Sequence, residues 1–198
     1  MSAALVDKFH RKLQAVEKTR ATSEEAFARG EFLRRDIEAV YEGLFLRCVV
    51  SFEDLLENVF FNVLNGNSDR HEWDSKISGN VKTLKDCVLE GKRYLDWLPI
   101  QETVKRSRVY LRRGKPFSLF DEDDKSKIAQ VVVIRHAIAH ASSHAQRSFK
   151  SKVIGGTPLA RNEKSPAGFL RSIARRGPTT TRFQIYTQAL GKAALKLK

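Results

Sequence analysis

The sequence predicts an all-α protein. Along several stretches of the 198-residue chain, apolar residues recur every three or four positions, which is the period of a helix with one buried face. Stretches in which apolar and polar residues alternate are scarce, and no internal repeat is present. With 41% hydrophobic and 30% charged residues, the composition is that of a globular chain able to bury one core. We therefore expect an all-α helical bundle.

Two helices are expected in the first third of the chain. Residues 5–16 carry apolar side chains at helical spacing, and the polar residues 19–25 follow them. The strongest pattern runs from about residue 31 to residue 63 and contains little proline or glycine. Asn65-Gly66-Asn67 then supplies a stop signal. The wide apolar surface of this second helix is typical of the central helix of a bundle.

Three further helices are expected before residue 150. The polar residues 68–79 predict a loop, and a short helix follows over residues 80–91. Pro99 is suited to the first position of the next helix, which Gly114 and Pro116 close. The acidic residues 121–124 favour a helix start, and the pattern after them continues through Ser142.

The pattern weakens beyond Phe149. Ser165-Pro166 predicts a short helix that ends at Gly177-Pro178, and the tail from about residue 181 is predicted as helix, although its first residues also alternate like a strand. We divide the chain into a helical bundle, residues 1–150, and a basic C-terminal helical extension, residues 151–198, packed on or beside the bundle.

The positive charge is unevenly distributed. The net charge is +13, and residues 151–198 contain ten Lys or Arg and one Glu, which gives +9. This excess indicates a polyanionic partner, with nucleic acid first and an acidic membrane surface second, although a solvated basic face is the simpler alternative. Within this segment the candidate substrate-binding residues are Arg171, Arg175, Arg176 and Arg182.

Composition also argues against several classes of protein. The uncharged apolar stretches are far shorter than the roughly 20 residues of a membrane span, so we expect no membrane association through a helix. The first residues include an acid and a base where a secretory signal would be apolar. Cys48 and Cys87 are too few for a disulfide scaffold or a thiolate zinc site. These features predict a cytoplasmic protein.

Residues 131–144 contain three of the five histidines, His136, His140 and His144. Neighbouring pairs are four residues apart and can in principle share a zinc ion, but the first and third lie ~12 Å apart along a helix. The glutamate of a His-Glu-x-x-His helix is also missing. We therefore expect no metal and no other cofactor. A purely structural role remains the simplest interpretation of His144, His10 and His71.

Arg135 is followed by His136 and, five residues after the arginine, by His140. This pattern resembles the Arg-x4–6-His motif of the HEPN superfamily (higher eukaryotes and prokaryotes nucleotide-binding domains), in which the residue after the arginine is commonly Asn, Asp or His. The resemblance covers roughly residues 30–148, including the long early helix and the late helix that carries the motif. The motif is short, so the helical order around it supplies much of its weight.

The resemblance implies a compact helical bundle that forms a homodimer, with the motif helices of two protomers lining one cleft. It implies a metal-independent endoribonuclease, such as a toxin or a phage-defence effector, whose partners are RNA (tRNA or mRNA) and in some cases an antitoxin protein. Other members of the superfamily are non-catalytic and bind nucleic acid, a nucleotide or a partner protein, which is the alternative function. A third possibility is a basic helical protein that acts structurally on DNA or a membrane.

The residues suit RNA cleavage by the 2′-hydroxyl. We assign His140 to general acid/base work, because imidazole titrates near neutral pH, and Arg135 to stabilising the charge of the transition state. His136 would position the phosphate. Glu53 or Glu57 of the long helix is expected to support Arg135. On one straight helix Arg135 and His140 would point about 140° apart, so their cooperation requires a distorted helix or approach from opposite flanks.

Overall fold

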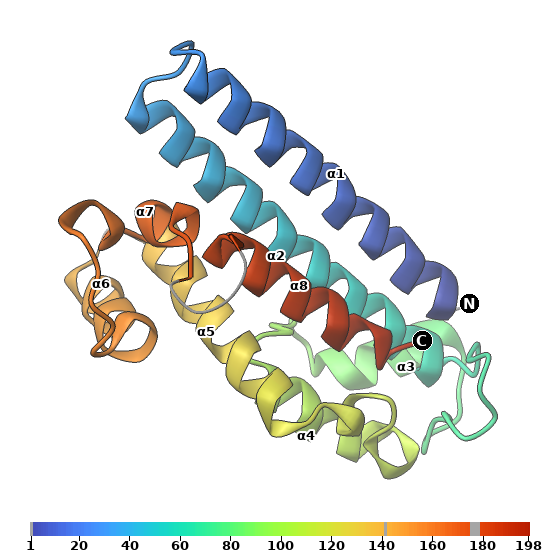
Figure 1. The fold of residues 1–198 in the computed structure, drawn as a ribbon. Helices are drawn as coiled ribbons and strands as arrows, with labels where there is room; N and C mark the ends of the chain where they lie inside the picture. The colour runs from blue at the N-terminus through green and yellow to red at the C-terminus, as the bar shows by residue number, and fades with distance from the viewer. Residues whose placement is uncertain (1, 141, 175–178) are drawn as a thin grey trace.

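The first two helices form a long antiparallel pair along one side of the molecule (Figure 1). Helix α1 spans Ser2–Ala28 and α2 spans Arg34–Leu64. At 1.5 Å per residue, α2 is about 46 Å long. Its buried residues follow one another at intervals of one to four from Ile37 to Leu64, so that α2 contributes to the core along its whole length. This arrangement agrees with the wide apolar surface that the sequence predicts for it.

Helix α1 continues well beyond its apolar pattern. In the polar part, the Thr19 and Ser23 hydroxyls donate to backbone carbonyls four residues earlier, at 3.0 and 2.8 Å. Glu17 and Glu24 bond to side chains of the C-terminal segment. The apolar period stops here because this half of the helix contacts its neighbours through polar groups.

The middle of the chain forms short helices connected by loops. Helix α3 spans Val81–Leu89, and Asn80 caps its start by accepting from the Thr83 N–H at 3.0 Å. Helix α4 spans Ile100–Tyr110. Pro99 therefore precedes α4 instead of starting it, and α4 ends before Gly114. Two single 3-10 turns, Arg112–Gly114 and Phe117–Leu119, connect α4 to the next helix.

The second half of the chain supplies four more helices. Helix α5 spans Glu122–Ala139, and α6 spans Ser143–Phe149 and continues into one π-helical turn, Lys150–Ile154. A 3-10 turn follows at Arg161–Glu163. Helix α7 spans Pro166–Arg171 and α8 spans Arg182–Leu195. The predicted C-terminal helix is therefore present, whereas Ile173, predicted as part of the preceding helix, pairs with Thr181 in an isolated β-bridge.

The computed structural model describes residues 2–140, 142–174 and 179–198. In these ranges the chain forms eight α-helices and no β-strand, which confirms the predicted all-α class. Within the same ranges, no helix combines the length and the apolar composition needed to cross a bilayer.

The C-terminal helix shares the core of the bundle. Helix α8 packs against α1, α2 and α5, and in Figure 1 it lies along α2 between α1 and α5. Phe183 is fully buried, and its ring meets Tyr41 edge-on at 5.4 Å and Phe45 at 6.2 Å between centroids. Because buried residues of α7 and α8 belong to the same apolar cluster as those of α2 and α5, the described part of residues 151–198 is held by the core itself.

Candidate functional site

Helix α5 carries the predicted catalytic residues near its C-terminal end. Its N-terminus is fixed by a capping box, in which Asp121 accepts from the Asp124 N–H at 2.9 Å and Asp124 accepts from the Asp121 N–H at 3.1 Å. The buried apolar face of the helix consists of Ile128, Val131, Ile134 and Ala137. Because this face is held against the core, the half-buried Arg135 and the exposed His136 lie off it, toward the surface.

The helix ends earlier than the sequence predicts. It stops at Ala139, and His140 has an extended backbone with φ −129° and ψ 117°, whereas the pattern predicts one helix through Ser142. The Ser142 hydroxyl instead caps a new helix, α6, by accepting from the Ala145 N–H at 3.3 Å. The angle of a straight helix therefore does not apply to Arg135 and His140, because the histidine follows the last helical turn.

The structure places two motif residues, His136 and His140, beside each other at the end of α5, and Arg135 directly precedes His136 in the chain. The rings of His136 and His140 are 5.9 Å apart between centroids, with 60° between their planes, and both residues are exposed. The pKa of His136 is lowered from its ordinary value by partial burial, by the positive charge of Arg135 and by His140. Both neighbours thus act electrostatically on the His136 imidazole. At neutral pH the shift favours the uncharged form, which can accept a proton.

Of the two glutamates proposed as support, Glu53 is the electrostatic neighbour of Arg135. Burial raises the pKa of the half-buried Glu53 carboxyl, Arg135 opposes that rise, and Asp96 adds to it. Among the described residues, Arg135 forms no ion pair within 4 Å, so Glu53 acts on it through space. Glu57 has another partner, since it accepts a hydrogen bond from the Trp97 indole N–H at 3.1 Å.

A loop that the sequence analysis did not single out lies beside this part of α2. Asp96 acts electrostatically on Glu53, and the next residue, Trp97, is buried and bonded to Glu57. Arg106 of α4 lies 5.0 Å from the centre of the Trp97 ring and donates to the Asp96 carbonyl at 3.2 Å. No spacing rule could have found these contacts, because the loop and α2 are some 40 residues apart in the chain.

Two of the four predicted substrate-binding arginines, Arg171 and Arg182, are among the described residues, and both have partners within the chain. Arg171 donates two hydrogen bonds to Glu24, at 2.8 and 3.0 Å, and lies 4.2 Å from the centre of the Phe27 ring. Arg182 is buried, lies over the Phe169 ring at 4.9 Å and donates to the Ser172 hydroxyl. Their contact with substrate stays a prediction. The other two residues, Arg175 and Arg176, lie outside the described residues.

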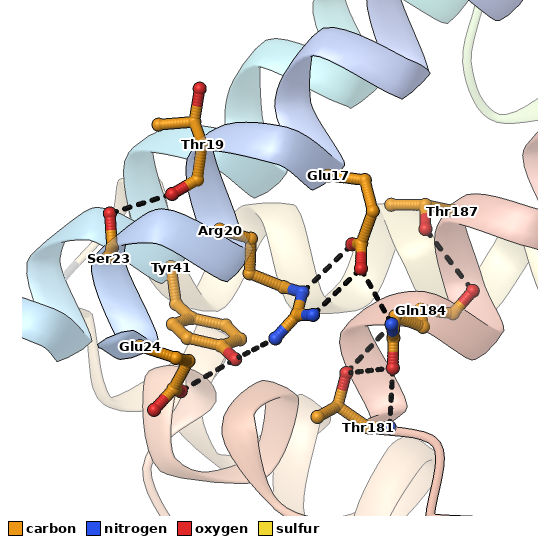
Figure 2. Close-up of polar contacts among 9 residues, drawn as sticks. All are labelled: Glu17, Thr19, Arg20, Ser23, Glu24, Tyr41, Thr181, Gln184 and Thr187. Carbon is orange, nitrogen blue, oxygen red and sulfur yellow. Dashed lines mark hydrogen bonds and ion pairs between the residues drawn. The ribbon is translucent and has the colours of Figure 1, made fainter. Parts of the chain in front are cut away.

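Arg171 belongs to a chain of polar contacts that attaches the C-terminal segment to α1 and α2. Figure 2 shows Arg20 between Glu17 and Tyr41, and the Tyr41 hydroxyl donating to Glu24. The Gln184 amide of α8 donates to Glu17 at 2.7 Å. Burial raises the pKa of Tyr41 to about 12, so the phenol stays protonated and can donate to Glu24. These contacts indicate a structural role for this region.

No group of three or more His, Cys, Asp or Glu within the described residues is arranged to hold a metal ion. Cys48 is buried and Cys87 is exposed, and both are free thiols. No protein-family model, no curated protein and no solved structure matches this chain. The function must therefore be argued from the site.

Proposed function

We propose that this protein is a HEPN-like, metal-independent endoribonuclease that cleaves RNA by attack of the 2′-hydroxyl on the adjacent phosphate. The observation that carries the proposal is the pair of exposed imidazoles of His136 and His140, whose ring centres are 5.9 Å apart at the end of α5, next in the chain to the guanidinium of Arg135. Such cleavage needs a proton acceptor, a proton donor and a fixed positive charge, and these three side chains supply them.

Each residue has a role in the proposed reaction. The 2′-oxygen bonds to phosphorus, and the bond from phosphorus to the 5′-oxygen breaks. One imidazole takes the proton of the 2′-hydroxyl, and the other gives a proton to the departing 5′-oxygen. His140 is the essential acid/base group, and the lowered pKa of His136 suits it to receiving a proton as well as to orienting the phosphate. Arg135 neutralises the charge that develops on the phosphate oxygens.

Glu53 supports this arrangement without touching the substrate. Its carboxylate would attract the Arg135 side chain from the side of α2 and limit the orientations that the guanidinium samples. The products are a 2′,3′-cyclic phosphate and a free 5′-hydroxyl, so the reaction consumes no co-reactant.

The test is an incubation of purified protein with tRNA and with mixed mRNA in EDTA. We expect fragments that end in a 2′,3′-cyclic phosphate, and His140→Ala and Arg135→Ala should lower the cleavage rate by about 10²-fold or more. His71→Ala is the matched control, because His71 is exposed in the loop before Trp73. This variant should cleave RNA at the rate of the parent chain. RNA that stays intact, or cleavage that survives both site substitutions, would refute the catalytic proposal.

The resemblance also motivates a homodimer in which each copy completes the site of the other. Mixing the Arg135→Ala and His140→Ala chains tests this directly. If one site uses residues of both copies, mixed dimers regain part of the lost activity; if the protein is monomeric by light scattering, or no mixture recovers activity, this part of the proposal is wrong. A role as a toxin or defence effector, with or without an antitoxin protein, is part of the same proposal and would be tested by expressing active and His140→Ala chains in cells.

The non-catalytic alternative makes a different prediction. A binding module would hold RNA, a nucleotide or a protein and leave the RNA intact. Binding of intact RNA by the wild-type chain in EDTA, with no cyclic phosphate after prolonged incubation, would favour it.

A further inference from the structure

The helix that follows the motif carries a basic hollow of about 640 Å³. It lies on α6 and the π-helical turn, and we call it the α6 hollow. Helix α6 itself packs against α5 (Figure 1). It is lined by His144, Arg147, Ser148, Lys150, Ser151 and Lys152. None of these side chains is acidic or apolar. From the sequence alone, His144 is expected to have a structural role, and the other five residues have no predicted role.

The cations of the α6 hollow are free to bind a ligand. Arg147, Lys150 and Lys152 are exposed, and within the described residues none of them forms an ion pair or a side-chain hydrogen bond. Arg171 differs, since its guanidinium is already matched to Glu24. No Asp or Glu occurs between Asp124 and Glu163 in the sequence, and within the described residues folding brings no carboxylate of another segment into an ion pair with these bases.

The fold holds this surface in one orientation. Ala145 and Phe149 are buried on the opposite side of α6, and the Phe149 ring meets Phe169 edge-on at 5.5 Å. His144, Arg147 and Ser151 follow at intervals of three and four residues, which places them on one face of the helix. With Phe149 anchored in the core, that face points outward.

The α6 hollow is connected to the candidate catalytic residues. The Gln146 amide of α6 donates to the Ala137 carbonyl in the last turn of α5 at 2.9 Å, which fixes the two helices relative to each other. Four residues separate His144 from His140, so their Cα atoms are at most about 14 Å apart. An RNA strand cleaved at His140 would therefore pass within a few nucleotides of the α6 hollow.

We propose that the α6 hollow binds the phosphate backbone of single-stranded RNA and holds the strand beside Arg135 and His140. This inference rests on the proposed function for the identity of the ligand. Arginine offers forked donors to phosphate oxygens, lysine adds point charges, and the two serine hydroxyls add hydrogen bonds. Contacts of this kind fix the position of the strand and do not read its bases. The hollow has no apolar side chain to insert into a lipid bilayer, which favours RNA over a membrane surface.

The test separates binding from cleavage by using the His140→Ala chain, in which we expect cleavage to be about 10²-fold slower or more. Binding of a labelled 20-nucleotide single-stranded RNA is followed by fluorescence anisotropy at several salt concentrations, with and without Arg147→Gln, Lys150→Gln and Lys152→Gln together. We expect binding at least tenfold weaker at 0.1 M salt. The slope of log K against log salt should become shallower by about 2, because each lost phosphate contact accounts for about 0.7.

The matched control removes the same charge elsewhere. Lys8, Arg11 and Lys18 are exposed on α1 and form no ion pair within the described residues, and changing all three to Gln should leave the slope nearly unchanged. If the control weakens RNA binding as much as the hollow variant does, RNA affinity depends only on the net charge of the protein, and the proposal is wrong. A hollow variant that binds RNA like its parent, or that loses only its binding to vesicles containing anionic lipid, also overturns it.

The outcome also separates this inference from the proposed function. If the hollow variant loses RNA binding but the wild-type chain never cleaves RNA, the hollow is confirmed as a binding site and the catalytic proposal fails. If cleavage depends on His140 while the hollow variant keeps both its affinity and its KM, the catalytic proposal stands and the hollow has no role in binding.

Discussion

Replacing Arg171 by Gln tests whether this arginine attaches the C-terminal segment or contacts RNA. Its two hydrogen bonds to Glu24 join α7 to α1, and the two side chains are 24% and 29% exposed. Exposed ion pairs contribute about 0–1 kcal/mol, whereas breaking a fully buried pair costs about 3–5 kcal/mol. For this half-buried, bidentate pair we expect Arg171→Gln to lower the free energy of unfolding by about 2 kcal/mol, between those two limits.

The assay is urea denaturation of the two single variants and the double variant with Glu24→Gln. If the free energy of unfolding falls by about 2 kcal/mol per molar urea, the urea midpoint of the Arg171→Gln variant should be about 1 M lower than that of the parent chain. The double variant should lose less than the sum of the single variants, with a coupling of about 1 kcal/mol, because the second substitution removes a contact that is already broken.

Two results would show that this reasoning is wrong. One is additivity of the two substitutions within about 0.3 kcal/mol, which would mean that the pair contributes nothing beyond its separate members. The other is a marked loss of RNA affinity in Arg171→Gln with an unchanged urea midpoint. That result would place the guanidinium in contact with substrate.

Three further predictions follow from the same structure. Phe183→Ala removes a fully buried ring and should cost about 3–5 kcal/mol in one cooperative urea transition, whereas a separate early transition would show that α8 unfolds independently. Burial acts to raise the pKa of Glu17, but hydrogen bonds from Arg20 and Gln184 together lower it below its ordinary value, and the hydrogen bonds from Arg171 lower the pKa of Glu24. The stability that these carboxylates contribute is therefore present above the ordinary pKa of a glutamate and is lost as pH falls through their folded values, which the urea midpoint from pH 7 to pH 3 measures. The pKa of His136, measured by NMR titration, should lie below 6.5 and should rise in the Arg135→Gln variant. A titration midpoint that does not move in this variant would contradict the influence of Arg135 on His136.

The helices could be predicted because their signals are local. The apolar period of α2 and the stop at Asn65 depend on neighbours within a few residues, and both agree with the structure. The second half of α1 lacked a continuous signal, because Glu17 and Glu24 bond to α8 and α7, although Ala26 is buried and Phe27 packs against the core. The end of α5 at Ala139 was also missed, because the Ser142 cap competes with a pattern that favours a longer helix.

The candidate site combines a local motif with contacts between residues far apart in the chain. Arg135, His136 and His140 are close in sequence, so a local motif could identify them, and the structure adds the ring distance and the influence of Arg135 on His136. The nearness of Glu53 to Arg135 and the bond between Glu57 and Trp97 join residues 40 or more positions apart. Such contacts depend on how helices pack, which no spacing within one helix determines.

The sequence by itself determined the all-α class, the motif at the end of α5 and the size of the positive charge. Only the tertiary structure decided which of those charges are free. In the C-terminal segment Arg171 is paired with Glu24, and Lys196 with Asp121 and Asp124, so several of the bases that dominate the charge count are neutralised locally. The bases of the α6 hollow stay unpaired, because folding brings no described carboxylate within ion-pair distance of them. Ion pairing depends on distances between remote residues, and those distances are fixed only when the helices pack.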